Sequence, residues 1–328
     1  MSPVRCSGPV TRREALRAGA LALGGVTLPQ LLAARADGRA PDTAVILFWM
    51  WGGPSHYETF DPKPDAPEEI RGPFRPTRTP VPGTQVCELF PQLARLADRF
   101  ALVRSLRHES SVHNDSSIEV LTGKPVPRPD PTSTALSEHP DFGMIAAALR
   151  RGSAPGVPGY VGIPKVPFMV RPAYLGVAAH GFATGDPAAP GFRPAALSPA
   201  AGLDRGRLST RHDLVGELDG LRRRAGDTPG GLGEMRGRAL DLLTSPAVAA
   251  AFDLGREAPR TRDRYGRHLW GQSCLLARRL VEAGTAVVTI DALAPKLSDR
   301  YFSWDDHINP QTKWDLADAM RCRAPFMD

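Results

Sequence analysis

The chain has 328 residues, of which 42% are hydrophobic and 23% are charged. This content is ample for a globular core and excludes a disordered chain. The net charge of +6 comes mostly from residues 1–36, which hold five arginines and one acidic residue. The remainder carries 36 basic and 34 acidic residues, and it has no basic stripe interleaved with aromatic residues. A nucleic-acid partner is therefore not expected.

The first 36 residues have the pattern of an export signal. Arg12 and Arg13 precede an apolar run over residues 18–34, which is too short for the roughly 20 residues of a membrane span. Paired arginines at this position are typical of the signal that directs folded proteins to the twin-arginine export machinery. Residues 34–36 fit a cleavage site, so the mature protein is expected to begin near Asp37, without a membrane span and in a periplasmic or extracellular location. An uncleaved membrane anchor is the alternative.

The cysteines of residues 37–328 do not predict a disulfide framework. Cys87, Cys274 and Cys322 are odd in number and widely spaced. Cys274 falls within a helical pattern, and we interpret it as a small buried hydrophobic residue.

Continuous apolar runs predict three strands, and helical patterns precede two of them. The runs at residues 44–51, 100–104 and 285–290 are typical of strands buried on both faces of a parallel sheet. Helical patterns at residues 89–98 and 261–283 precede the second and third runs. This alternation predicts an α/β fold with a mostly parallel sheet flanked by helices.

Residues 152–200 are rich in proline and glycine, which break regular elements. Aromatic residues such as Phe168 and Tyr174 are unusual in a solvated linker. We therefore predict an ordered insertion that covers a cleft, with a linker as the alternative. Residues 312–328 read as a helix without a polar tail, and we interpret the chain as truncated at its C-terminus.

The first segment that could carry chemistry follows the first predicted strand. Gly52 and Gly53 allow the backbone to approach a ligand closely. Ser55, His56 and Asp61 then offer a hydroxyl, an imidazole and a carboxylate. Ligands of open α/β sheets bind beyond the carboxyl ends of the strands, so this loop is a candidate site. The alternative is an ordinary Gly-Gly-Pro turn.

The second segment follows the run at residues 100–104. If the backbone is extended at His113 and Asp115, both side chains point to one side, as two metal ligands must. Ser116 could cap a helix that runs to Thr122, whose N-terminus would favour an anion such as phosphate or sulfate. The alternative is helix capping alone.

The third segment contains Asp305, Asp306 and His307. In an extended loop Asp305 and His307 share a face, and a carboxylate with an imidazole suits zinc or manganese. A solvent-facing acidic loop is the alternative. Asp291, at the end of the third predicted strand, is a further candidate.

These segments together resemble the exported domain-of-unknown-function family 1501. The resemblance rests on the twin-arginine leader and on Trp51-Gly52-Gly53-Pro54-Ser55, Phe60-Asp61-Pro62-Lys63, His113-Asn114-Asp115, Leu121-Thr122-Gly123-Lys124 and Trp304-Asp305-Asp306-His307. It implies an alkaline-phosphatase-like and sulfatase-like superfamily fold, a divalent metal (zinc, manganese or calcium), and hydrolysis of small-molecule or polysaccharide phosphate or sulfate esters. It also implies further ligands beyond residue 328.

The chain departs from that superfamily at two positions. His113 stands where the resemblance places the nucleophile, and glycines follow the first strand where a metal-binding aspartate is usual. We therefore expect residues 37–328 to form an incomplete alkaline-phosphatase-like domain. The expected metal ligands are Asp305, Asp306, His307, Asp115, His56 and Asp61, and the expected catalytic residues are His113, Ser116 and Ser55. A non-catalytic exported binding protein, an inactive fragment that retains the fold and a structural partner protein are the alternatives.

Overall fold

The structure, a computed structural model, describes residues 43–150, 156–197, 205–224, 239–292, 296–297, 300–301, 304 and 315–328. The chain divides into two units, Met1–Thr43 and Ala44–Asp328, and all the described residues except Thr43 belong to the second. Across these ranges no helix combines the length and the apolar character needed to cross a membrane.

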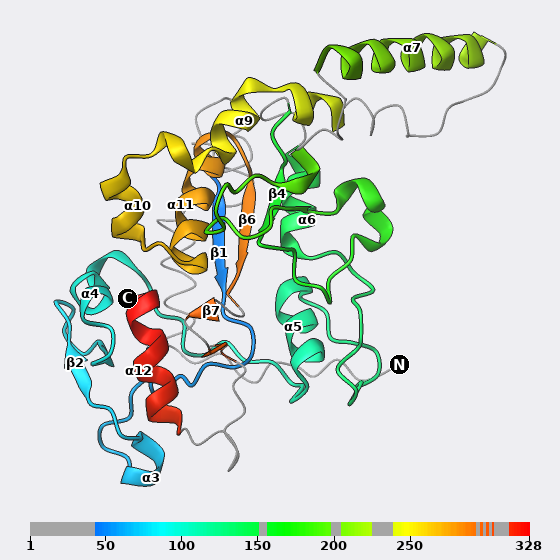
Figure 1. Cartoon of the computed structure of the whole chain (residues 1–328). Coiled ribbons are helices and arrows are strands. Elements are labelled where there is room, and N and C mark those ends of the chain that lie inside the picture. The colour runs from blue at the N-terminus through cyan, green and yellow to red at the C-terminus, as the bar shows by residue number, and fades with distance from the viewer. Residues whose placement is uncertain are drawn as a thin grey trace, which may run out of the picture. The chain divides into compact units, whose positions relative to one another are not determined.

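A parallel sheet lies at the centre of the second unit. Its strands are β1 (Val45–Trp49), β6 (Val287–Asp291), β4 (Tyr160–Ile163) and β5 (Phe182–Ala183). Their order is β1-β6-β4-β5, and every neighbouring pair is parallel (Figure 1). The structure thus confirms a mixed α/β fold with a mostly parallel sheet flanked by helices.

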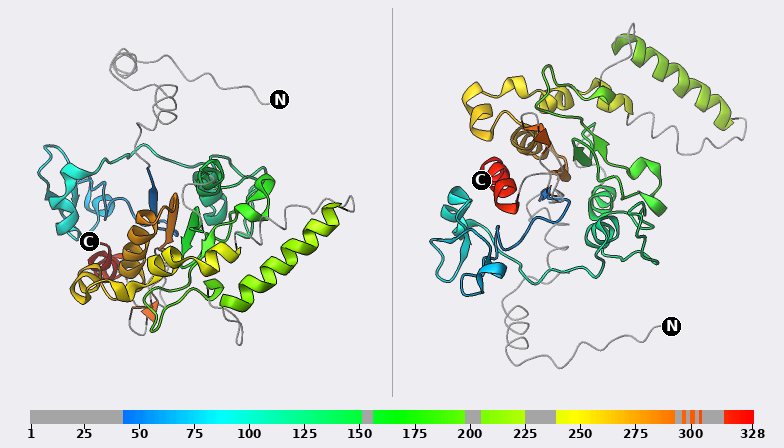
Figure 2. Two further views of the ribbon diagram at one scale, coloured as in Figure 1. Left: turned by 90° about the horizontal axis from the view of Figure 1, so that it is seen from above. Right: turned by 60° about the horizontal axis from the view of Figure 1, so that its bottom comes forward.

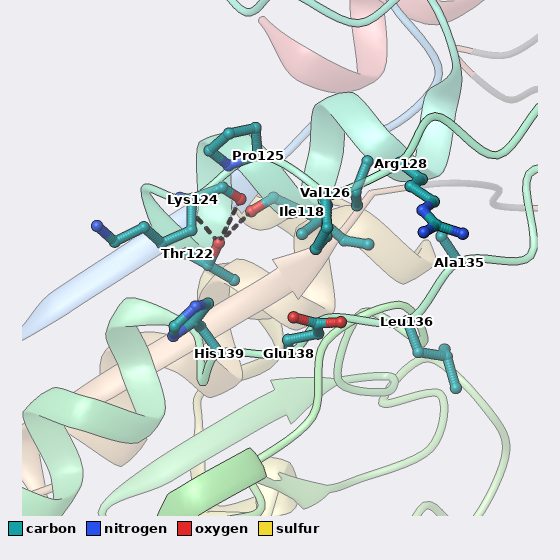
Figure 3. A pocket seen from close by; sticks show the side chains of 11 residues that line it. Ile118, Thr122, Lys124, Pro125, Val126, Arg128, Ala135, Leu136, Glu138 and His139 are labelled. Carbon is teal, nitrogen blue, oxygen red and sulfur yellow. Dashed lines mark hydrogen bonds between the residues drawn. The ribbon is translucent and has the colours of Figure 1, made fainter. Parts of the chain in front are cut away.

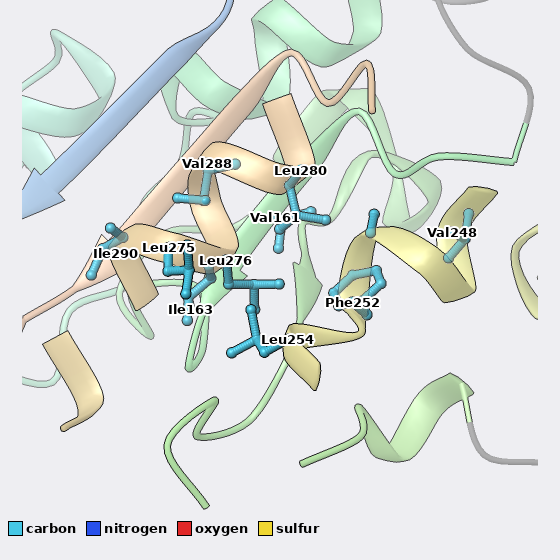
Figure 4. Close-up of a cluster of buried hydrophobic side chains, with 12 residues drawn as sticks. Val161, Ile163, Val248, Phe252, Leu254, Leu275, Leu276, Leu280, Val288 and Ile290 are labelled. Carbon is cyan, nitrogen blue, oxygen red and sulfur yellow. The ribbon is translucent and has the colours of Figure 1, made fainter. Parts of the chain in front are cut away.

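Helices cover both faces of this sheet, because successive residues of a strand point to opposite sides. On one face Val288 and Ile290 pack against α11 (Leu269–Glu282) and α9 (Pro246–Phe252) in the largest buried cluster (Figure 4). On the other face Val287 packs with residues of α5 (His113–Thr122) and α6 (Phe142–Leu149). Strand β6 is therefore buried along its whole length.

Strand β1 differs from the prediction that it is buried on both faces. Val45 and Ile46 are each 44% exposed. The reason is topological, since β1 is an edge strand of the described sheet and pairs there only with β6. The strands predicted at residues 44–51 and 285–290 are confirmed as β1 and β6.

The strand predicted at residues 100–104 is wrong. These residues form a loop in which Val103 is 74% exposed. The loop is held instead by Arg104, which donates hydrogen bonds to the carbonyl oxygen of Phe60. The helix expected at residues 89–98 is shorter, as α4 (Pro91–Arg95) followed by the 3-10 turn η1 (Ala97–Arg99).

Residues 156–197 of the Pro/Gly-rich segment are ordered, but they are not an insertion. The segment supplies β4 and β5 to the sheet and also contains the 3-10 turns η2 (Ala173–Leu175), η3 (Val177–Ala179) and η4 (Ala195–Leu197). Its prolines lie outside the two strands, where they remove no hydrogen bond of the ladder. A Cβ at Gly162 would lie only 2.4 Å from the backbone nitrogen of Val166, so glycine is required for the chain to fold back after β4.

The single helix expected at residues 261–283 is two helices. Helix α10 (Pro259–Tyr265) ends at Gly266, whose φ of 88° interrupts the helix, and α11 begins at Leu269. Gln272 joins the two helices, because its side-chain amide donates hydrogen bonds to the carbonyl oxygens of Arg262 and Gly266.

A second cluster of elements surrounds the C-terminal helix α12 (Leu316–Met327), which confirms the helix predicted there. Helix α12 packs beside α4 and the antiparallel pair β2 (Pro76–Arg78) and β3 (Gln85–Cys87) (Figures 1 and 2). The Asp328 carboxylate accepts hydrogen bonds from the first backbone N–H groups of α4. The remaining elements are α3 (Glu68–Arg71), α7 (Arg205–Arg224), η5 (Leu254–Arg256), β7 (Lys296–Leu297) and β8 (Arg300–Tyr301).

Two helical glycines should respond oppositely to substitution by alanine, because Gly271 is packed against the junction between α10 and α11 and Gly216 is not. In Gly271→Ala the new Cβ would lie 1.8 Å from the carbonyl oxygen of Tyr265, whereas in Gly216→Ala of α7 it would meet nothing within 4 Å. We expect Gly271→Ala to lower the free energy of unfolding by about 1–3 kcal/mol or more. Gly216→Ala should raise it by up to roughly 1 kcal/mol. Urea denaturation of both variants measures the difference, and equal effects would contradict the packing at Gly271.

Candidate functional site

The carboxyl edge of the sheet brings together the loop after β1 and Asp291, two of the predicted candidates. Strand β1 ends at Trp49, directly opposite Asp291 at the end of β6. The loop after β1 turns at Gly52 and Gly53, whose φ values of 107° and 81° favour glycine. Because ligands bind beyond the carboxyl ends of parallel strands, this edge is the candidate site.

Helix α5 brings its first turn to the loop after β1. The His113 ring lies 5.2 Å from the ring of Trp51, measured between centroids. Trp51 also packs with the α5 side chains Ile118 and Leu121 in the cluster on this face of the sheet. The structure therefore brings the first and second predicted segments together.

The local conformation at His113 and Asp115 differs from the prediction. The helix begins at His113, after Val112, whose side chain does not cap it, and Ser133 Oγ accepts from the backbone N–H of Asn114 in the first turn. His113 and Asp115 are thus helical, and residues two apart in a helix point about 200° apart around its axis. They do not share a side, and the cap predicted at Ser116 is wrong, because Ser116 lies inside the helix and its Oγ donates to the carbonyl oxygen of His113.

Asp115 is the most unusual of the predicted residues. It is only 1% exposed. Its Oδ2 accepts a hydrogen bond of 2.9 Å from the backbone N–H of Asp130, while its buried Oδ1 has no hydrogen-bond partner. Buried carboxylate oxygens are nearly always satisfied, so Oδ1 fits a position for a cation or a water molecule.

The Asp61 carboxylate lies in a network of ion pairs. Lys63 Nζ is 2.7 Å from Oδ2, Arg104 Nε is 3.2 Å from Oδ1, and His56 Nδ1 is 3.4 Å from Oδ2. Partial burial opposes ionisation, but the hydrogen bond and charge of Lys63, helped by His56 and Arg104, hold the pKa of Asp61 below its ordinary value. To bind a metal, Asp61 and His56 would have to leave these ion pairs.

Ser55 also has a partner within its own loop. Its Oγ donates a hydrogen bond to the carboxylate of Glu58, a residue that is buried. This hydrogen bond orients the hydroxyl predicted as a nucleophile or anion donor.

Asp305, Asp306 and His307 lie outside the described residues, but the residue before them does not. Trp304 is 3% exposed, and its ring is stacked 5.5 Å from that of Trp270 with an interplanar angle of 6°. The guanidinium of Arg323 lies 5.6 Å above the same ring. Trp304 belongs to a buried cluster with Ala292, which directly follows Asp291. Residue 304 is therefore packed in the same buried cluster as the residue that follows β6.

A complete metal site is not visible in the described part of the chain. Among those residues, no three or more His, Cys, Asp or Glu side chains lie close enough together to hold a metal ion. Of the predicted ligands there, Asp115 has the buried, unsatisfied oxygen that a cation could use. Any site would need further ligands.

Sequence reasoning did not single out a buried polar network under the sheet. The Tyr160 hydroxyl donates to Asp141 Oδ2 at 2.8 Å and lies 3.2 Å from Thr289 Oγ1. Burial raises the pKa of both Asp141 and Tyr160. Asp141 also caps α6 by accepting from the backbone N–H of Met144. The network links α6 to strands β4 and β6. The sequence signal that could have located it is Asp141, an aspartate directly before the apolar helix α6.

Comparisons with known proteins give one match. A family model described as "Protein of unknown function (DUF1501)" matches residues 42–319. Searches of curated proteins and of solved structures found no match.

The described cysteines should differ sharply in reactivity. Burial raises the pKa of Cys87 and of Cys274 to about 11, whereas Cys322 is exposed. Since the thiolate is the reactive form, we expect a thiol reagent at pH 8 to label Cys322 at least tenfold faster than the other two. Mass spectrometry of the native Cys6→Ser chain checks this, with denatured protein as the control for complete labelling. Rapid native labelling of Cys274 would contradict the raised pKa that partial burial gives this thiol.

Proposed function

We propose that this chain, which belongs to the DUF1501 family of proteins of unknown function, is a metal-dependent hydrolase of phosphate or sulfate esters. The observation that carries the proposal is Asp115 Oδ1, a buried carboxylate oxygen without a partner in the first turn of α5. That turn contacts the loop after β1 at the edge of the sheet where α/β proteins bind ligands.

The first turn of α5 offers the groups that such a reaction requires. The N-terminus of this ten-residue helix carries partial positive charge, which favours the anionic oxygens of a phosphate or sulfate group. The His113 imidazole can take or deliver a proton, and its contact with Trp51 orients the ring.

A divalent metal fits the donor chemistry of these segments. Asp115 Oδ1 would contribute one oxygen, and Asp305, Asp306 and His307 would supply the rest. Mixed oxygen and nitrogen ligands suit zinc or manganese, and an all-oxygen subset would suit calcium. When bound, such a metal would lower the pKa of a coordinated water or neutralise the charge that develops on the ester.

The stack of Trp304 on Trp270 supports a role for the third segment at this edge. It holds the residue before Asp305 in the same buried cluster as Ala292, the residue that follows Asp291. Residues 305–307 follow Trp304 directly in the sequence, and we place the remaining metal ligands there.

The leader and the family resemblance extend the proposal. Paired arginines before a short apolar run support export of the folded protein by the twin-arginine machinery. The mature protein, beginning near Asp37, would then act in the periplasm or outside the cell. An alkaline-phosphatase-like superfamily relationship is part of this proposal and is supported by the parallel sheet with helices on both faces.

A non-catalytic binding protein is the second candidate. It is favoured by the histidine at the position that the resemblance gives to the nucleophile, and by the ion pairs that occupy Asp61. Such a protein would hold an anionic ligand at the first turn of α5 without turning it over.

Metal content tests the proposed site first. We expect the purified chain to retain zinc or manganese after dialysis, and Asp115→Asn and His307→Ala to reduce that content at least tenfold. Asp115→Asn keeps an oxygen that can accept from Asp130 N–H, so its effect isolates the lost charge. Asp98→Asn, at an exposed position of η1, is the matched control. Elemental analysis gives the metal stoichiometry, and retention of full metal content by both site variants would refute the metal site.

Turnover separates the two candidate functions. A hydrolase should release nitrophenol from 4-nitrophenyl phosphate or nitrocatechol from its sulfate ester when zinc, manganese or calcium is present, and His113→Ala should slow this release at least a hundredfold. Metal binding without turnover of either ester would instead support the non-catalytic binding protein.

A further inference from the structure

A pocket of about 340 Å³ lies at the other end of α5 from the candidate site. Ile118 and Thr122 of α5 line it, together with the segment that follows the helix and residues up to His139 (Figure 3). About nine residues of helix separate His113 from Thr122, or roughly 13 Å along the axis. The pocket is therefore distinct from the first turn of α5.

The charged groups of the pocket have a defined arrangement. Lys124 and Arg128 lie on opposite sides, and the Glu138 carboxylate lies between them (Figure 3). Apolar side chains, including Val126 and Leu136, form the rest of the lining. The pocket thus combines two cationic donors, one anionic acceptor and an apolar surface.

The turn between the lining residues Arg128 and Ala135 is held in place by the first turn of α5. Asp115 Oδ2 accepts from the backbone N–H of Asp130, and the Asn114 amide donates to the carbonyl oxygen of Ser133. Asp130 in turn accepts from Thr132 and Thr134, and the hydrogen bond from Thr132 lowers the pKa of Asp130 to about 2. Such a braced turn loses little entropy when a ligand binds.

Backbone strain is concentrated around the same pocket. Among the described residues, the non-glycine residues with positive φ are Ser133 at 56° and Ala173 at 44°. Ser133 lies in the braced turn, and Ala173 precedes Tyr174, whose ring is 6.0 Å from that of the lining residue His139. Strained backbone is often retained where it positions side chains for a ligand.

Tyr174 adds an aromatic surface beside the pocket. Its side chain is 70% exposed, although large aromatic residues are usually buried. Its contact with His139 places the ring at the rim. An exposed ring of this kind can pack against the C–H face of a sugar.

We propose that this pocket binds an acidic sugar unit. Glu138 would accept hydrogen bonds from sugar hydroxyl groups, Arg128 would bind a carboxylate or sulfate substituent, and Tyr174 would pack against the ring. Lys124 and Arg128 alone would suit any small anion, but the Glu138 carboxylate between them would repel a simple anion. A ligand that carries both hydroxyl donors and one acidic group complements Glu138 and Arg128 together. The proposal does not depend on the hydrolase activity proposed above.

Isothermal titration calorimetry of the full chain tests this site. The probes are galacturonic acid, its tetramer, neutral galactose and inorganic sulfate. We expect galacturonic acid to bind at least tenfold more tightly than either galactose or inorganic sulfate. Tighter binding of the tetramer would identify a polymer as the source of the sugar, and equal binding would identify a free sugar.

Two variants and their matched controls assign the binding to this pocket. Arg128→Gln should remove the preference for the acid over galactose, and Glu138→Gln should weaken binding of both sugars at least tenfold. Arg95→Gln on α4 and Glu69→Gln on α3 make the same changes at exposed positions and should bind like the wild type. The proposal is overturned if inorganic sulfate binds as tightly as the sugars, if no sugar binds, or if the pocket variants match their controls.

Discussion

The pairing of β6 with β1 on one side and β4 on the other holds the second unit together. Every residue of β6 is buried, and its side chains reach the clusters on both faces of the sheet. This pairing also sets the register in which Trp49 lies opposite Asp291. Since the strands are parallel, chain segments that are about 240 residues apart in sequence leave the sheet at one edge.

Helix α5 connects that edge to the rest of this face. Its first turn meets Trp51, its middle packs on the sheet through Ile118 and Leu121, and its last turn lines a pocket. The two carboxylate oxygens of Asp115 have different surroundings. Oδ2 accepts a hydrogen bond from Asp130 in the turn beside the pocket, and Oδ1 has no hydrogen-bond partner. A ligand bound to Asp115 Oδ1 would therefore contact a residue that also holds the turn beside the pocket.

The sequence predicted the elements that are apolar and continuous. The runs that became β1 and β6 needed no tertiary information, because their hydrophobic character alone favours burial. The run at residues 100–104 looked similar and is a loop, since four apolar residues before an arginine cannot reveal whether a neighbouring strand is available. Conversely, strand β4 was not predicted, because prolines surround it in the sequence. Its one sequence signal is Gly162, where the chain folds back so that the backbone of Val166 comes close.

The sequence predicted which segments follow the strands at the candidate site, but it did not predict how the side chains of α5 are oriented there. Strand ends correctly located the loop after β1 and Asp291, because parallel strands present their carboxyl ends together. The orientation of His113 and Asp115 depended on whether α5 begins at residue 113 or 116, and a run of Asn, Asp and Ser fits either start. The hydrogen bond from Asp130 to Asp115 could not be predicted, because it joins a helix to a turn whose conformation is fixed only by packing.

The stacked pair Trp270 and Trp304 has an optical consequence. Two indole rings held 5.5 Å apart and nearly parallel couple their electronic transitions, which gives a characteristic near-ultraviolet circular dichroism band. Because Trp304 directly precedes Asp305, the intensity of that band reports whether this part of the chain is seated against α11. The Trp270–Trp304 pair thus provides a spectroscopic signal next to residues 305–307, the proposed metal ligands.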